Sequence, residues 1–439
     1  MENSAKKGRS NDMKDYQQAL DWVHGLPPFS KRPGLERVRR LLDLLGNPQE
    51  RLRFIHVAGT NGKGSVTTMC SSILREAGYR TGLYISPFVI DFRERFQIDG
   101  EMISKAEFTR LCQEVREGYE TLRAQGILMN EYDVITALSL LYFHNHRCDI
   151  VCFEVGLGGL YDATNIIPPP EAAVIMKISY DHTAVLGDTL TAIAGEKAGI
   201  IKRGSVCVCY PDQEEEALAV IMEQCAQQGV PLILPNQSGI ELKQEGLEGS
   251  SFCYDGQEYE LALPGHHQVL NAVTAIETIR QLRDFQVSGE QLRRGLAKTT
   301  FPARMELLSQ HPLLLLDGAH NANGVQALMQ AVKKIEASPK IAVAGMLADK
   351  DYGAELALLS GAVDQLILTQ VQSARAESLS RLQDAAQGHG YPVSVCEDLR
   401  EAYELALKMA GADGLVVIFG SLFLASDLRR IILGKGKDC

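Results

Sequence analysis

A glycine-rich loop holds the residues of this sequence that are best suited to chemistry. The run GTNGKGS at positions 59–65 follows an apolar segment, 54–58, and precedes a stretch with apolar residues at helical spacing. Glycines let backbone N–H groups converge on phosphate oxygens, Lys63 can reach the terminal phosphates, and a hydroxyl can hold magnesium. The order strand, loop, helix therefore predicts phosphate binding in preference to a tight glycine turn with a solvated lysine. The loop departs from the general Walker pattern, since Val57 replaces its first glycine and an extra glycine precedes Ser65.

Three further polar residues stand where apolar segments end. Glu154 lies near the end of segment 150–155 and is followed by glycines, where an open sheet binds ligands and a carboxylate can hold magnesium. His182 follows the next apolar segment, and Lys197 comes fifteen residues later in GEKAGIIK. Spacing alone leaves their roles open. An acid such as Glu154 is as often structural, such a histidine more often caps a helix or turn, and such a lysine is more often solvated.

Short runs of Val, Ile and Leu alternate with amphipathic stretches, which is the pattern of buried parallel strands separated by covering helices. The fold class is therefore α/β. In the first part of the chain we predict helices at 35–45 and 134–143 and strands at 54–58, 81–85, 150–155, 173–178 and 206–210. In the last part we predict strands at 313–317, 341–345, 365–369, 393–396 and 415–419.

These two series of strands predict two domains. Between them, residues 240–263 are polar and Gly-rich and favour hairpins around an Asp-Gly pair, and helices are expected at 269–285 and 288–298. We predict a domain with a mostly parallel sheet and the phosphate loop at 1–298. A smaller doubly wound, Rossmann-like domain follows at 299–439 and begins with a linker.

The composition excludes several classes of protein. With 439 residues the chain can bury its own cores, so its ten scattered cysteines need not form a disulfide scaffold. The formal net charge of -11, without a long basic run, argues against binding to nucleic acid or anionic lipid. No apolar stretch approaches the roughly 20 residues that span a membrane, and the N-terminus lacks an apolar signal segment. We therefore expect a cytoplasmic protein that acts on small molecules.

Several longer stretches together carry a resemblance to a known family. They are PGLERVRRLLDLLGNPQ, HVAGTNGKGS, GLYISP, EVGLGGLYDATN, DHTAVLGDTLTAIAGEKAGIIK, GHHQVLNA, FPARME, DGAHNANG and FGSL. In order, spacing and letters the chain resembles the folylpolyglutamate synthases, with or without dihydrofolate synthase activity, among the Mur-type ligases. The resemblance covers nearly all of the chain after residue 15. It implies an ATP-binding central domain and a C-terminal glutamate-binding domain.

The resemblance also assigns roles to individual residues. The ATP-binding positions would be Thr60, Asn61, Gly62, Lys63, Gly64, Ser65, Asn271, Arg304 and Asp317. The magnesium ligands would be Ser65, Ser86, Glu154, His182 and Lys197, the last as a carbamate formed with carbon dioxide. Such a carbamate turns a cation into an oxygen donor that suits a hard metal. His320 and Ser421 would bind glutamate, and Lys63, Lys197 and His320 would be catalytic.

The activity that the resemblance implies is ATP-dependent addition of L-glutamate to the γ-carboxylate of a tetrahydrofolate through an acyl phosphate, with release of ADP and phosphate. The expected ligands are therefore ATP, Mg2+, a folate and L-glutamate, and K+ or another monovalent cation is a further candidate. The expected state is a monomer. Dihydrofolate synthase, which joins glutamate to dihydropteroate, is an alternative, either alone or as a second activity. A Mur-type ligase that acts on another acidic acceptor is the third possible activity.

Three departures from the family pattern bear on the substrate. Phe88 stands where the family usually has histidine, Leu160 where it usually has arginine, and Asp133 where it usually has glutamate. Because a leucine cannot replace a bidentate guanidinium, Phe88 and Leu160 put the substrate in question more than the nucleotide. The helix around Asp133 can absorb the loss of one methylene.

Two other classes of protein fit less well. A GTPase switch would need an Asn-Lys-x-Asp motif, and MLADKD has Ala348 in place of the asparagine. A nucleotide-preference assay separates the two, because the ligase should favour ATP and need an acceptor for sustained turnover. A catalytically dead binding protein would have no use for the full set of Lys63, Glu154, His182 and Lys197.

Overall fold

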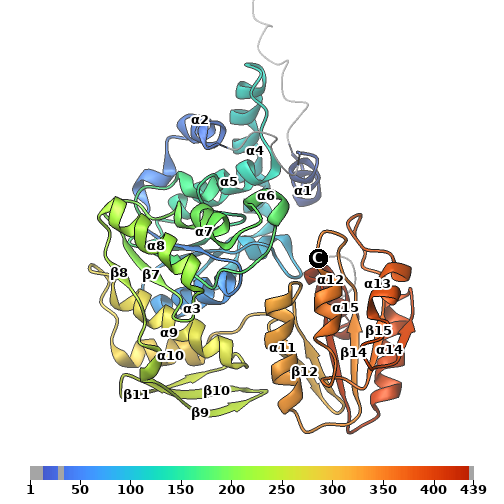
Figure 1. The fold of residues 1–439 in the computed structure, drawn as a ribbon. Helices are drawn as coiled ribbons and strands as arrows, with labels where there is room; N and C mark the ends of the chain where they lie inside the picture. The colour runs from blue at the N-terminus through green and yellow to red at the C-terminus, as the bar shows by residue number, and fades with distance from the viewer. Residues whose placement is uncertain (1–12, 28–33, 435–439) are drawn as a thin grey trace, which may run out of the picture.

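Residues 13–27 and 34–434 are described by the structure, a computed structural model in which two α/β units lie side by side (Figure 1). The first unit contains an eight-stranded sheet in the order β4-β3-β2-β5-β1-β6-β7-β8. Its strands are β1 (Phe54–Ala58), β2 (Thr81–Tyr84), β3 (Gln97–Ile98), β4 (Glu101–Met102), β5 (Ile150–Glu154), β6 (Ala172–Ile175), β7 (Val206–Cys209) and β8 (Leu232–Ile233). All neighbouring pairs from β2 to β8 are parallel, and β3 is antiparallel to both β2 and β4. The predicted α/β class with a mostly parallel sheet is confirmed.

Helices cover both faces of this sheet, which is why its central strands read as unbroken apolar runs. One face packs against α1 (Tyr16–His24), α2 (Glu36–Leu44), α4 (Lys105–Arg123) and α5 (Glu131–Asn145), and further along against α7 (Leu190–Ala198) and α8 (Glu215–Gln228). The other face packs against α3 (Lys63–Glu76), α9 (His266–Arg280) and α10 (Gly289–Ala297). Strand β1 serves both faces, because Phe54 points into the first core and Ile55 and Val57 point into the second.

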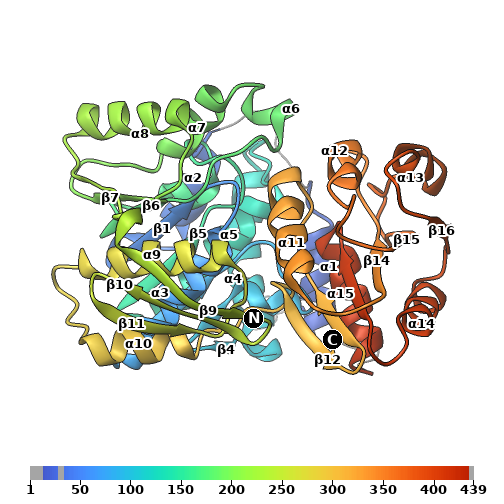
Figure 2. The same cartoon turned by 60° about the horizontal axis from the view of Figure 1, so that its bottom comes forward.

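The predicted hairpins form a separate antiparallel sheet of β9 (Ile240–Gly246), β10 (Gly249–Tyr254) and β11 (Gln257–Leu261). Asp255 and Gly256 make the predicted turn between β10 and β11, and both have positive φ angles. Phe252, Tyr254 and Tyr259 bury their rings against the core that α9 and α10 share. Figure 2 shows this small sheet next to α9 and α10, in the lower part of the first unit and away from α7 and α8.

The second unit has a six-stranded sheet in the order β12-β13-β17-β14-β15-β16. Its strands are β12 (Glu306–Gln310), β13 (Leu313–Leu316), β14 (Lys340–Ala344), β15 (Gln365–Leu368), β16 (Val393–Val395) and β17 (Leu415–Phe419). One face is covered by α11 (Ala322–Lys334), α12 (Tyr352–Ala357) and α13 (Leu379–Ala386), and the other by α14 (Leu399–Ala410) and α15 (Leu422–Ile432). Helices on both faces make this sheet doubly wound, as predicted.

Some strands differ from the prediction. Strand β6 ends at Ile175, so residues 176–178 belong to the following loop instead of to the strand. Four strands were not predicted: the two-residue strands β3, β4 and β8, and β12, which contains no fully buried residue. Such strands form on a sheet that already exists and carry no periodic pattern of their own.

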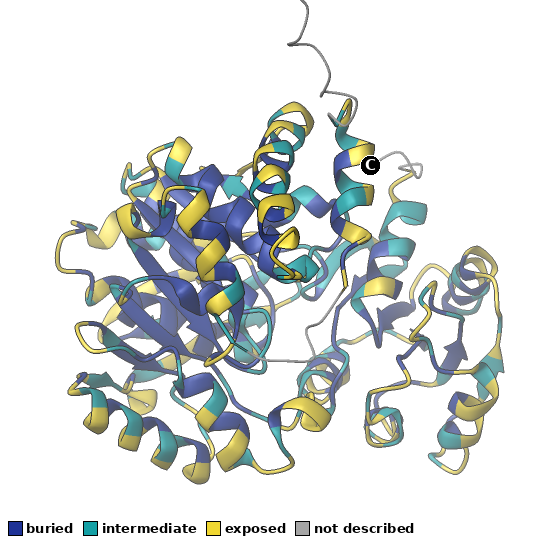
Figure 3. Cartoon of the chain, turned by 90° about the horizontal axis from the view of Figure 1, so that it is seen from above, coloured by how far each residue is buried: buried dark blue, intermediate teal, exposed yellow. Residues whose placement is uncertain are grey.

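Buried residues concentrate in the strands of both sheets, and exposed residues lie on the outer sides of the helices (Figure 3). Within residues 13–27 and 34–434, no helix is long and apolar enough to cross a membrane.

Candidate active site between the two units

The glycine-rich loop lies between β1 and α3, as predicted. Gly62 is the residue before α3 and has a φ angle of 84°, which glycine adopts without strain. The loop is fastened to the chain after β6, because the N–H groups of Thr60 and Asn61 donate to the carbonyl of Lys177, at 2.9 and 3.2 Å. The Lys63 ammonium donates to the carbonyls of Gly59 (3.0 Å) and Thr60 (3.2 Å). Burial lowers the pKa of Lys63, although Glu154 nearby opposes this effect.

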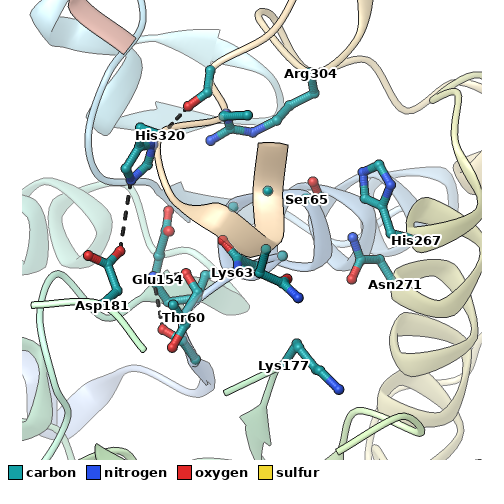
Figure 4. Close-up of a pocket in the computed structure, with 18 of the residues that line it drawn as sticks. Thr60, Lys63, Ser65, Glu154, Lys177, Asp181, His267, Asn271, Arg304 and His320 are labelled. Atoms are coloured by element: carbon teal, nitrogen blue, oxygen red, sulfur yellow. Dashed lines mark hydrogen bonds and ion pairs between the residues drawn. The ribbon is translucent and has the colours of Figure 1, made fainter. Parts of the chain in front are cut away.

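A cavity of about 220 Å³ lies over this loop and is lined by residues of both units (Figure 4). Of the residues predicted from the sequence, the following line it: Thr60, Asn61, Gly62, Lys63, Gly64, Ser65, Ser86, Glu154, His182, Lys197, Asn271, Arg304, Asp317 and His320. Ser421 is the exception. Its hydroxyl caps α15 by accepting from the N–H of Phe423 at 3.0 Å, and the residue after it, Leu422, lines the cavity. A role for Ser421 in binding glutamate stays a prediction.

Glu154 is a buried carboxylate at the floor of the cavity. Its Oε2 accepts from the N–H of Ser86 at 2.9 Å, and the Ser86 hydroxyl accepts from Arg95 at 2.8 Å. Burial raises the pKa of Glu154, and the positive charge of Lys63 opposes the shift. Among the described residues there is no group of three or more His, Cys, Asp and Glu side chains that could hold a metal ion. The predicted magnesium set contains two such side chains, so it would depend on hydroxyls, a modified lysine and the nucleotide itself.

Lys197 lies inside the protein, so the alternative of a solvated cation is wrong. Its side chain is buried, and Nζ donates to the carbonyl of Gly59 at 2.8 Å. Burial, together with the charge of Lys63, lowers the pKa of Lys197 to about 7. A large fraction of Lys197 is therefore a neutral amine at neutral pH, which is the form that reacts with carbon dioxide.

His182 occupies the position before the short helix α6 (Thr183–Leu186), with a φ angle of 51°. Its backbone therefore makes a turn, but its side chain makes no cap and instead lines the cavity. The prediction that this histidine lies in a turn is confirmed, and its role as a magnesium ligand stays a prediction.

The second unit contributes an arginine, an acid and a histidine. Arg304 lies between Ala303 and Met305, whose φ angles of 52° and 47° are rare for residues other than glycine. The Asp317 carboxylate holds this turn by accepting from the N–H of Met305 at 2.7 Å. Such a conformation persists only where its surroundings enforce it, and here it turns Arg304 toward the cavity.

His320 has a defined tautomer. Nδ1 lies 2.8 Å from the carbonyl of Gly318, which can only accept, so Nδ1 donates and Nε2 carries the lone pair. Burial lowers the pKa of His320 to about 4, so the ring is neutral at pH 7. Nε2 points toward Asp181 of the first unit at 4.0 Å (Figure 4).

Sequence reasoning missed several residues of the cavity and its edge. Asp181, Lys177 and His267 line it. Lys350 bonds to Asp181. Asp181 belongs to the stretch DHTAVLGDTLTAIAGEKAGIIK, which carries part of the family resemblance, and Lys350 belongs to MLADKD, which was compared with the Asn-Lys-x-Asp motif of GTPases. Nothing in the sequence indicated that these two residues meet.

Gly62→Ala is expected to abolish nucleotide binding, and Gly78→Ala provides a matched control. Both glycines have φ near 90°, so each alanine should cost about 1–2 kcal/mol in folding free energy. Only at Gly62 would the new Cβ also lie 2.6 Å from Oδ1 of Asn271; at Gly78 nothing lies within 4 Å. Thermal melting should show a loss of stability for both variants, larger for Gly62→Ala because of the contact with Asn271, and calorimetric titration with ADP should show loss of binding for Gly62→Ala alone. Equal ADP affinities would contradict a role for this loop in nucleotide binding.

Comparison with known proteins places this site in context. Residues 57–279 match the model of the Mur ligase middle domain, and residues 303–422 match that of the Mur ligase, glutamate ligase domain. The chain is 36% identical to a dihydrofolate synthase/folylpolyglutamate synthase of Bacillus subtilis over 94% of its own length and 98% of the relative's. It is also 36% identical to a folylpolyglutamate synthase of Lacticaseibacillus casei, over 96% and 99%. Among solved structures, the folylpolyglutamate synthase of Mycobacterium tuberculosis complexed with ADP superposes with a TM-score of 0.89 and 31% identity, covering 95% of this chain and 98% of that one.

Proposed function

The chain belongs to the folylpolyglutamate synthase family of Mur ligases, and on this premise we propose that it adds L-glutamate to the γ-carboxylate of a tetrahydrofolate. It is an ATP-dependent ligase that forms a carbon–nitrogen bond. The observation that carries the proposal is the shared cavity, in which the phosphate loop faces Arg304, Asp317 and His320 of the second unit. A reaction that joins two substrates after activation by a third needs all three in one enclosed place.

In the first step, a carboxylate oxygen of the folate attacks the γ-phosphorus of ATP. The bond from that phosphorus to ADP breaks, and the product is an acyl phosphate. Lys63 is placed to stabilise the charge on the transferred phosphoryl group, for which its ammonium must leave the carbonyls of Gly59 and Thr60. Arg304 supplies a second positive charge from the other side of the cavity.

In the second step, the amine of glutamate attacks the acyl carbon. The ammonium first loses one proton to solvent, the carbon–nitrogen bond then forms, the carbon–oxygen bond to phosphate breaks, and the second proton leaves with the released phosphate. Because Nε2 of His320 carries a lone pair and the ring is neutral, it is suited to accept a hydrogen bond from the incoming ammonium and to orient it. Burial of the cavity between the two units keeps water from the acyl phosphate.

The residues present fit magnesium in their chemistry. Hard oxygen donors surround the end of the phosphate loop, and the buried Glu154 has no ion-pair partner within bonding distance among the described side chains. We assign Ser65, Ser86, Glu154, His182 and a carbamate on Lys197 to hold it. When bound, Mg2+ would neutralise charge on the phosphates. Carbamylation is supported by the burial of Lys197 and by its pKa of about 7.

We place the boundary between the two domains at residues 298/299, directly after α10, which ends at Ala297. The segment from there to β12 at Glu306 connects the two sheets and carries Arg304 into the cavity. A movement of the second domain would therefore move Arg304, Asp317 and His320 together relative to the phosphate loop.

Release of phosphate from ATP tests the proposed function. With Mg2+ and glutamate present, tetrahydrofolate should support sustained release, and the product should gain the mass of one glutamyl residue. Without an acceptor, release should fall to background, because the acyl phosphate cannot form. Dihydropteroate turnover would add the second activity. If neither acceptor supports turnover, the ligase would use a different acid, and Phe88 and Leu160 would be the first residues to examine.

A further inference from the structure

One carboxylate of the first unit is held by several groups of the second. Asp181 Oδ1 accepts from the Lys350 ammonium at 2.6 Å, and Oδ2 accepts from the Asn321 side chain at 3.3 Å. The side chains of Lys350 and Asp181 are only 6% and 9% exposed, so this ion pair is shielded from solvent and from salt. Lys350 lies between β14 and α12, in a loop that the mechanism above does not use.

A second carboxyl group interacts electrostatically with Lys350 and has no hydrogen-bond partner among the described residues. It belongs to Glu355, in the first turn of α12, which is 0% exposed and whose two side-chain oxygens are both unpaired within the part of the chain that the structure describes. Burial raises the pKa of Glu355 to about 8, and the positive charge of Lys350 opposes this shift. A buried carboxyl group without hydrogen bonds destabilises the fold, and neither packing nor the reaction accounts for it.

These observations fit an ammonium that has two alternative acceptors, one on each unit. We propose that Lys350 is a positioning residue that docks the second unit onto the first, bonding to Asp181 when the units are together and to Glu355 when they separate. The orphaned Glu355 is then the resting acceptor of Lys350 in the open state. It offers Lys350 an acceptor within its own unit when Asp181 moves away.

Docking at Lys350 would complete the cavity. Asn321 also donates to Asn61 of the phosphate loop at 3.1 Å, and Asn61 donates to Asn323 at 3.1 Å. Asp181 Oδ1 accepts from the N–H of His182 at 2.8 Å, so the same carboxylate also holds the turn that carries His182. The Lys350 contact therefore brings His320 and its neighbours to the phosphate loop in a fixed register.

The distance between the units tests this role directly. Spin labels on genetically encoded residues at Glu216 of α8 and Gln383 of α13, both exposed, avoid the ten native cysteines. In the ligand-free protein, Lys350→Met and Asp181→Asn should each lengthen and broaden the distance distribution, to the same extent. Glu355→Leu removes the second acceptor of Lys350, so the distance distribution between the labels should become narrower and shift to shorter distances.

Lys334→Met is the matched control. Lys334 also pairs across the two units, with Glu245 at 2.6 Å, but its side chain is 64% exposed. Its removal should leave the distribution unchanged, because an exposed ion pair contributes little. Kinetics give a second readout that rests on the proposed function: Lys350→Met should lower kcat/KM for glutamate at least tenfold, Lys350→Arg should recover part of it, and Glu355→Leu should keep kcat within twofold.

Two results would overturn the inference. One is an unchanged distance distribution in both Lys350→Met and Asp181→Asn. The other is a longer distance in Glu355→Leu, which would make Glu355 a support of the docked state. Because the distance measurement uses no substrate, a wrong folate assignment would show in the kinetics alone and leave this test intact.

Discussion

Lys63→Ala is expected to reduce ATP-dependent phosphate release by about 1,000-fold, close to the level without acceptor. Removal of a single group that stabilises transition-state charge typically costs 100- to 1,000-fold in rate. Lys63 is the ammonium of the phosphate loop and lies at the start of α3, where it can follow the phosphoryl group during transfer. Phosphate release by the wild type and the variant, with tetrahydrofolate, glutamate and Mg2+ saturating, measures the effect.

The fold of Lys63→Ala should stay intact. Lys63 is half-buried, and among the described residues its ammonium bonds to carbonyls of its own loop, so its loss removes a desolvation cost along with two hydrogen bonds. Circular dichroism melting should therefore show little change. Lys333→Ala on α11, an exposed lysine, serves as the control and should behave as the wild type in both assays. Normal turnover in Lys63→Ala would exclude Lys63 from phosphoryl transfer.

The sequence predicts the central strands well, since both faces of each sheet are covered. A strand buried on both faces is apolar along nearly its whole length, so the sequence LVVIF predicts β17 and FIHVA predicts β1, in which the buried His56 is the polar exception. Strand β12 could not be predicted in this way. It is an antiparallel edge strand whose residues are half-buried or exposed, and it forms by pairing with β13.

The loop GTNGKGS could be placed because its neighbours in sequence are its neighbours in space. The burial of Lys197 and the contact that Lys350 makes could not be predicted in this way, because the surroundings of both lysines come from distant segments. Lys197 touches Gly59 across 138 positions, and Lys350 touches Asp181 across 169. Burial of a lysine depends on what packs over it, and a single sequence does not contain that information.

Two of the departures from the family pattern are accommodated by contacts with neighbouring residues. The shorter Asp133 still caps α5, accepting from the N–H of Asn130 at 3.2 Å, and also bonds to Arg37 at 3.0 Å. Phe88 joins an aromatic cluster, with its ring centroid 5.6 Å from that of Phe92 and the Arg95 guanidinium 5.4 Å over its ring. A histidine at position 88 would bring a polar ring into this cluster. Compared with histidine, Phe88 lacks a hydrogen-bonding group near Ser86 but packs better against the neighbouring aromatic rings.

Leu160 has a different setting. Its side chain packs over Gly199, where an added Cβ would lie 2.5 Å from the Leu160 Cβ, yet the residue is still 40% exposed. It therefore keeps the loop after β5 close to the end of α7 without offering a charge to the substrate.

Lys197→Ala is expected to lower ligase activity by at least about 100-fold, in line with the loss of a group that holds charge at the reacting centre. If a carbamate on Lys197 is the active form, added acetate should restore part of the activity by placing a carboxylate in the vacated space. Acetate should not stimulate the wild type. A variant that keeps full activity would contradict any role for Lys197 in the reaction.

The carbamate itself should be visible without any assay of activity. With a pKa of about 7, Lys197 is neutral in about one tenth of molecules at pH 6 and about nine tenths at pH 8. Since only the neutral amine reacts, the carbamate should increase over this range at a fixed concentration of dissolved CO2. An exposed lysine, with its usual pKa near 10.4, stays charged throughout. Carbon NMR with ¹³C-labelled bicarbonate should show a carbamate signal in the wild type that is absent from Lys197→Ala, whereas any signal from Lys202, whose pKa burial lowers to about 8, should be present in both proteins. If no signal appears at pH 8 with Mg2+ present, the lysine acts as an amine, and the metal site must be completed by the nucleotide and the hydroxyls alone.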